Sequence, residues 1–89
     1  MKQVIIDGAA IADRQALHRT LADKLALPEW YGSNLDALFD CLTDLSEDIH
    51  IAVTHFDALE ETLGSYAQSF RKVLLRAAKE NLHIHLHLM

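Results

Sequence analysis

Ile49-His50-Ile51-Ala52-Val53 is the stretch that decides the fold, because this short apolar run lies between two pairs of helical patterns. A run of this length, rich in β-branched residues, predicts a strand. Near the start of the chain, Val4-Ile5-Ile6 ends at Asp7-Gly8, which predicts a buried strand followed by a turn. Near the end, residues 83–89 alternate strictly and predict a half-covered strand. Its apolar side is formed by Ile84, Leu86 and Leu88, and its other side by His83, His85 and His87.

Two helices are expected before the middle strand. Asp13 can cap the first, and Pro28 stops it, because the residue before a proline is pushed out of the α region. The loop Pro28-Glu29-Trp30-Tyr31-Gly32 follows. Ser33 then offers an N-cap to the second helix, with Asp36 at its third helical position. The apolar side is formed by Leu17, Leu21 and Leu25 in the first helix and by Leu35, Leu38, Leu42 and Leu45 in the second.

Two more helices are expected between the middle and last strands. Asp57-Ala58-Leu59-Glu60 opens one and Ser65-Tyr66-Ala67-Gln68 opens the other, each with a capping pattern. Asn81 is expected to be a left-handed residue past the end of the latter. Strands separated by helical crossovers are usually parallel. We therefore expect one domain, residues 1–89, of the α/β class, with a three-stranded parallel sheet, four helices and the order β-α-α-β-α-α-β.

The composition bounds the kinds of partner. The formal net charge is −5, from 8 basic and 13 acidic residues. Nucleic acid needs clustered Lys and Arg, so direct RNA or DNA binding is disfavoured and a cationic protein partner is favoured. The one cysteine, Cys41, cannot form an internal disulfide, and no signal peptide or membrane-spanning segment is evident. A reducing cytoplasm is the simplest expectation.

Three aspartates lie on the polar side of the second helix. With Asp36 set at zero, Asp40 falls at about 40° and Asp44 at about 80°, away from the leucines. Like charges one turn apart destabilise a helix, and an anion near its C-terminus opposes the dipole. No lysine or arginine lies between Lys24 and Arg71 to offset them. A solvated polar face and a binding face are both compatible with this geometry.

Two aromatic residues adjoin this helix in the preceding loop. We expect one of Trp30 and Tyr31 to cap the core. An exposed aromatic residue beside acidic residues is also how binding hot spots are built, since it excludes water next to charges that steer a partner.

The segment Pro28-Glu29-Trp30-Tyr31-Gly32-Ser33-Asn34-Leu35-Asp36-Ala37-Leu38-Phe39-Asp40-Cys41-Leu42-Thr43 resembles the barstar family, intracellular inhibitors of the ribonuclease barnase. The family has a Pro-Glu-aromatic-Tyr-Gly-x-Asn-Leu-Asp-Ala-Leu-x-Asp segment, which this sequence matches almost residue for residue. The likeness covers the whole chain and is strongest over residues 17–43, including Leu17-His18-x-x-Leu21.

The resemblance implies a parallel three-stranded sheet with four helices, and a second helix that fills a ribonuclease active site. Asp40 would take the place of substrate phosphate, Asp36 would pair with nearby basic groups, and Trp30 would stack near the catalytic histidine. Polar and shape contacts would come from Gly32, Asn34, Leu35 and Thr43.

Four positions depart from the family. Phe39 stands where barstar has tryptophan, and Leu45 lies where it has another nearby. Asp44 replaces a glycine, and Ala77 falls where barstar has a glutamate that pairs with the enzyme. These departures bear on which enzyme is bound.

Metal binding, thiol chemistry and catalysis have weaker support in the sequence. His83, His85 and His87 share one strand face, with His50 on the adjacent strand, but a polar sheet face explains them better than a metal site. Cys41 is expected to be a small core residue. Asp36 and Asp40 on an exposed convex face should both stay ionised, which disfavours a catalytic carboxylate pair.

The sequence thus predicts a monomeric cytoplasmic inhibitor of a small basic ribonuclease or nuclease toxin, without enzymatic activity, cofactor, metal or membrane. The alternative is a barstar-type interaction module for a basic protein that is not a nuclease. The predicted partner-binding residues are Trp30, Tyr31, Gly32, Asn34, Leu35, Asp36, Phe39, Asp40, Thr43 and Asp44.

Overall fold

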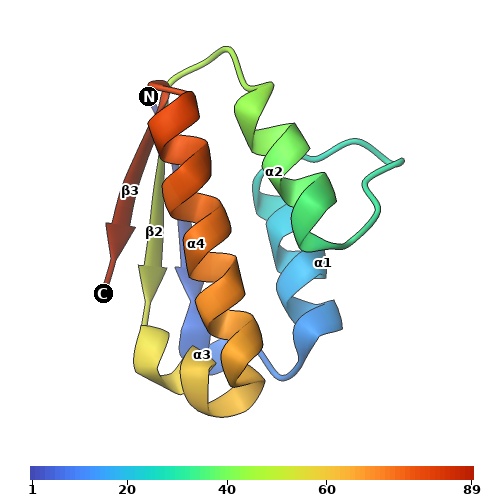
Figure 1. The fold of residues 1–89 in the computed structure, drawn as a ribbon, viewed down its shortest axis with the longest axis vertical. Coiled ribbons are helices and arrows are strands. Elements are labelled where there is room, and N and C mark those ends of the chain that lie inside the picture. Colours follow the sequence, from blue (N-terminus) through green and yellow to red (C-terminus); the bar gives the residue numbers. More distant parts are fainter.

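Three parallel strands form one sheet in the order β1-β2-β3, in a computed structural model that describes residues 1–89. Two helices separate each strand from the next, so the predicted fold class and element order are confirmed (Figure 1). The elements are β1 (Lys2–Asp7), a 3-10 turn (Gly8–Ala10), α1 (Arg14–Lys24), α2 (Leu35–Thr43), β2 (Ile49–Thr54), α3 (Phe56–Leu63), α4 (Ser65–Glu80) and β3 (Ile84–Leu88).

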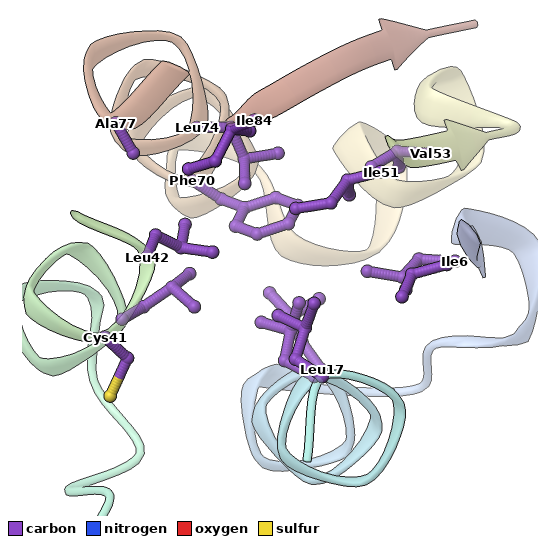
Figure 2. Close-up of a cluster of buried hydrophobic side chains, with 14 of the residues drawn as sticks. Ile6, Leu17, Cys41, Leu42, Ile51, Val53, Phe70, Leu74, Ala77 and Ile84 are labelled. Atoms are coloured by element: carbon purple, nitrogen blue, oxygen red, sulfur yellow. The ribbon is translucent and has the colours of Figure 1, made fainter. Parts of the chain in front are cut away.

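One face of the sheet carries the core. Figure 2 shows Phe70 of α4, Leu42 of α2 and Leu17 of α1 converging with Ile51 and Val53 of β2. All five side chains are fully buried. Because every second residue of a strand points to the same side, β2 supplies this face through alternate positions. The core therefore fixes where α2 sits relative to the sheet.

The other face of the sheet has no helix over it. Ile5 points to this side and is 57% exposed, while its neighbours Val4 and Ile6 are buried. The predicted buried strand is therefore buried at Val4 and Ile6 but not at Ile5. A continuous apolar run is typical of parallel strands covered on both faces, and here only one face is covered.

The second helix begins one residue later than predicted. Asn34, not Ser33, is the N-cap: its side-chain oxygen accepts from the backbone N–H of Ala37 at 2.8 Å. Ser33 is instead in the left-handed region with φ of 53°. Asp36 still lies in the first turn, where a negative charge is favourable.

The capping patterns of the last two helices are not used. His55, with φ of 52°, precedes α3, and Asp57 lies in the first turn of α3 without capping it. Gly64 precedes α4 and makes no side-chain cap. Gln68 donates to the carboxylate of Glu60 on α3 rather than to the start of its own helix, so a contact between helices replaces the predicted box.

The first helix ends before the proline that was expected to stop it. It ends at Lys24, and Ala26 then adopts the left-handed region with φ of 52°. The backbone N–H of Leu27 donates to the carbonyl of Ala22 at 3.0 Å. This is a Schellman-type end, with alanine at the position that glycine usually fills.

Asn81 is not the left-handed residue that was predicted. Its backbone is extended, with φ of −126° and ψ of 103°, and its side chain is buried. Its amide nitrogen donates to the carbonyls of Leu42 and Leu45, each at 2.9 Å. Asn81 therefore ties the C-terminal end of α2 to the chain between α4 and β3. None of the four helices is long and apolar enough to cross a membrane.

Candidate functional site

The exposed side of α2 carries the acidic residues as predicted. Asp36 and Asp40 are exposed, whereas Leu38 and Leu42 are fully buried on the opposite side. Asp44 is also exposed and is the C-cap residue, just past the last helical residue. We call Asp36, Asp40 and Asp44 the acidic face.

The acidic face has no cationic partner within the molecule. The two ion pairs of the chain join His55 to Asp7 at 3.0 Å and His83 to Asp48 at 2.9 Å, both away from α2. Like charges one turn apart on a helix repel by roughly 0.2–0.5 kcal/mol. The acidic face is therefore mildly unfavourable for folding, and its negative charge stays available to an external partner.

Trp30 and Tyr31 have opposite orientations in the loop before α2. The Trp30 side chain is 79% exposed, and Tyr31 is 8% exposed. The expectation that one of the two aromatic residues caps the core is confirmed, and that residue is Tyr31. Tyr31 can support a partner contact only by holding the loop, whereas Trp30 presents its ring to solvent.

A hydrogen-bonded cluster under the loop holds Tyr31 in place. The Tyr31 hydroxyl lies 2.5 Å from Nδ1 of His18, and the Tyr66 hydroxyl lies 2.6 Å from Nε2 of the same ring. Arg14 stacks on Tyr66, with its guanidinium carbon 4.3 Å from the ring centroid. The cluster thus connects the loop to α1 and α4 through His18, which is 2% exposed.

Burial shifts the protonation of this cluster towards neutral forms. It lowers the pKa of His18 and raises the pKa of Tyr31 and of Tyr66, although Arg14 opposes the shift of Tyr66. A neutral imidazole can donate from one nitrogen and accept at the other, so it can satisfy both hydroxyls. The sequence had shown His18 only as part of the family likeness; its place beside Leu17 on the apolar side of α1 was the available signal.

A shallow hollow of about 510 Å³ lies between the loop and α2. It brings Trp30 together with Asp40, Thr43 and Asp44, which the sequence predicted as site residues. The rest of its lining is Leu25, Ala26, Leu27, Pro28, Cys41 and Leu45. An exposed aromatic ring and two carboxylates therefore share one concave surface.

Asn34, Leu35 and Phe39 do not line this hollow, and Thr43 does. Asn34 caps α2 and also donates to the carbonyl of Gly32 at 3.3 Å. Leu35 and Phe39 are half-buried at the border between the acidic face and the core. The Thr43 hydroxyl donates to the carbonyls of Phe39 and Asp40, at 2.9 and 3.2 Å.

Cys41 is buried beside the hollow, as expected for a core residue. Burial, followed by the nearby charges of Asp40 and Asp44, raises the pKa of its thiol. A thiol held protonated is a poor nucleophile and a poor metal ligand.

Histidines occupy the uncovered face of the sheet. His50 pairs in register with His85, and its ring centroid lies 6.3 Å from that of His87. We call His50, His85 and His87 the histidine face. No group of three His, Cys, Asp or Glu side chains is arranged to hold a metal ion.

Comparison with known proteins places the chain in a family. The family model described as "Barstar (barnase inhibitor)" matches residues 1–88. The chain is 40% identical over 81 residues to the Bacillus subtilis (strain 168) protein named "Putative ribonuclease inhibitor YrdF", an alignment that covers 90% of this chain and 89% of that protein. The chain therefore belongs to the barstar family.

Proposed function

We propose that this protein inhibits a small basic ribonuclease, of the barnase type or a nuclease toxin, by covering its active site with α2 and the preceding loop. The observation that carries the proposal is the unpaired acidic face beside the exposed ring of Trp30. Family membership, and a relative whose name describes a ribonuclease inhibitor, support the same function.

The proposed contact follows from the chemistry of the partner. A ribonuclease site must be cationic to hold RNA, and fixed carboxylates are complementary to it. Asp40 lines the concave surface and takes the place of a substrate phosphate. Asp36, one turn earlier, pairs with neighbouring basic groups, and Trp30 supplies the apolar anchor that excludes water.

The other predicted residues shape this contact. Gly32 and Asn34 form the exposed turn that leads into α2, and Thr43 lies in the hollow beside Asp40. Leu35 and Phe39 supply apolar surface at the border. Tyr31 contributes from inside, by holding the loop. Asp44 adds a charge at the helix end where the family has a glycine.

Calorimetric titration against barnase tests the proposal. Wild-type protein should bind, and the Asp36→Ala/Asp40→Ala double variant should bind far more weakly. His85→Ala is the matched control, because it alters an exposed residue on the opposite side of the sheet. Absence of binding to barnase and related small ribonucleases, or equal binding by the double variant, would contradict it.

The salt dependence of association gives an independent test. Steered encounters between opposite charges slow as ionic strength rises, because the Debye length falls from about 30 Å at 0.01 M to about 10 Å at 0.1 M. The on-rate of the wild-type protein should drop over this range, and that of the double variant should drop less. An on-rate independent of salt would argue against the acidic face.

A second candidate function is an interaction module for a basic protein that is not a nuclease. Asp44 and Phe39, which differ from the family pattern, lie within or beside the acidic face and favour a changed partner. The two candidates separate in one assay: an inhibitor suppresses RNA cleavage by its partner, and a module binds without affecting cleavage. In either case we propose a monomeric cytoplasmic protein that acts by binding rather than by catalysis.

A further inference from the structure

The fourth helix places an arginine against the border of the acidic face. Helices α2 and α4 pack side by side (Figure 1). The guanidinium carbon of Arg76 lies 4.9 Å from the centroid of the Phe39 ring. Phe39 in turn separates the acidic face from the core. The partner-facing surface of α2 therefore continues directly onto Arg76.

The neighbouring position on α4 cannot take this role. The family likeness aligns Ala77 with a glutamate of barstar that pairs with the enzyme, and Ala77 is fully buried and belongs to the core cluster (Figure 2). A buried methyl group does not reach a partner, so Ala77 does not replace that charge contact. Arg76, one residue earlier and exposed, is the α4 side chain beside Phe39.

Arg76 is held in position but its charge is unpaired. The two ion pairs of the chain involve only histidines, so no carboxylate lies within 4.0 Å of the guanidinium. Stacking on an aromatic face orients a guanidinium while leaving its N–H donors free. A planar set of donors is thus presented to whatever covers α2.

Further cations extend this charge along α4. Lys72 and Lys79 are exposed and lie four residues before and three residues after Arg76, so they fall on the same side of the helix. Arg76 therefore belongs to a basic stripe, formed by Lys72, Arg76 and Lys79 and interrupted by one carboxylate, the exposed Glu80 four residues after Arg76. A partner with only positive charge would be attracted by the acidic face and repelled by the basic stripe.

We propose that the ribonuclease bound by this protein carries a carboxylate at the rim of its cationic active site, facing Arg76, and that Arg76 on Phe39 selects for it. This inference rests on the proposed inhibitor function and specifies its partner. Selectivity between related partners arises from repulsion as well as attraction. The acidic face would then recognise basic ribonucleases in general, and Arg76 would distinguish among them.

A charge-reversal experiment tests the proposal, with barnase as the probe. Single glutamates are introduced in turn at exposed positions around the barnase active-site cleft, and each variant is titrated with wild-type protein, Arg76→Glu and Arg71→Glu. Arg71 lies on the same helix, but it borders a depression near Phe56 and Met89, away from Phe39. Arg71→Glu therefore makes the same change in net charge without touching the proposed contact.

We expect at least one barnase variant to bind the wild-type protein about ten-fold more tightly than unmodified barnase does. Arg76→Glu should abolish that gain, and Arg71→Glu should retain it. Phe39→Leu, which removes the ring beneath the guanidinium, should reduce the gain in part.

Two outcomes would overturn the inference: no glutamate improves binding, or the gain survives in Arg76→Glu. Asp40→Ala separates this failure from failure of the inhibitor function. If Asp40→Ala weakens binding throughout while Arg76→Glu changes nothing, only the rim carboxylate is refuted. If Asp40→Ala also has no effect, both the inhibitor function and the rim carboxylate are refuted.

Discussion

The acidic face and the histidine face present two kinds of charge on different sides of the molecule. The acidic face carries carboxylates that have no internal counter-ion. The histidine face carries imidazole side chains, none of which takes part in the two ion pairs. Elsewhere on the surface, Asp7 and Asp48 each lie within 3.0 Å of a histidine nitrogen. On α2, by contrast, three unpaired carboxylates lie close together beside the exposed Trp30, which supports the proposal that a partner binds there.

The two regions also differ in how they are supported from inside. Beneath the acidic face, Tyr31 is fixed by His18, and the end of α2 is fixed by Asn81. The histidine face belongs to strands whose hydrogen bonds hold them without such side-chain anchors. A rigid charged surface keeps its geometry for binding, and these two buried polar residues provide that rigidity.

Asp40→Ala should give the largest contrast between the two faces. Removing one partner of a buried charge pair at an interface costs about 2–5 kcal/mol, a range that rests partly on barnase with barstar. Calorimetry with a ribonuclease bound by the wild-type protein measures the loss. His85→Ala should leave the affinity unchanged; an equal loss from both substitutions would remove the distinction between the faces.

Asn81→Ala should weaken the support of α2 and lower the free energy of unfolding by about 1–3 kcal/mol, since two carbonyls lose a buried donor. Urea denaturation followed by circular dichroism measures this. Gln68→Ala is the control, because its hydrogen bond to Glu60 is exposed. A loss from Asn81→Ala no larger than that of the control would show that α2 is held by packing alone.

Acidification should destabilise the fold through His18. Burial lowers the pKa of His18 in the folded protein, so the unfolded chain binds the proton more readily. This contribution to stability is present above about pH 6.5, the ordinary value, and is lost as the pH falls below it. A single proton accounts for at most about 1.4 kcal/mol per pH unit.

The His18→Gln variant should flatten this dependence, measured as the free energy of unfolding between pH 7.5 and 5.5. His85→Gln should leave the slope as in the wild type, because that side chain is exposed. If the slope survives in His18→Gln, an exposed histidine or a carboxylate is responsible instead.

Ala26→Gly should have the smallest effect, a stabilisation of about 0.5–1 kcal/mol. Ala26 is left-handed at the end of α1, where an L side chain is strained and glycine is not. Thermal unfolding of Ala26→Gly beside Ala12→Gly provides the comparison. Ala12 does not have positive φ, so its replacement should slightly destabilise the protein. A loss of stability in both variants would contradict the strain at Ala26.

The fold was predictable from two short apolar runs, one alternating strand and the leucines along the helices, because strands joined by helical crossovers are usually parallel. The boundaries of the helices were less predictable from the sequence. Ser33 and Asn34 both suit an N-cap by residue type, and only the backbone conformation separates them. Asn81 suited a left-handed position, but its contacts with Leu42 and Leu45 depend on α2 lying beside it, which local sequence does not encode.

The residues of the candidate site also divide into those that could be predicted from the sequence and those that could not. The acidic face followed from helix geometry, whereas the choice of Trp30 over Tyr31 as the partner-facing ring came only from the family resemblance. Arg76 was not predicted as a site residue, because it lies far from α2 in the sequence. It reaches Phe39 only because α4 packs against α2 in the folded protein. His18 was similarly hidden: its hydroxyl partners lie 13 and 48 residues away.

The central claim is that the acidic face occupies a ribonuclease active site, and competition with an active-site ligand tests it most directly. The Kd for barnase is measured alone and with a 3′-mononucleotide at ten times its own Kd. If the two compete for one site, the apparent Kd should rise about eleven-fold, because only the unliganded enzyme remains available. An unchanged Kd with nucleotide bound would contradict the claim and place the contact elsewhere on the enzyme.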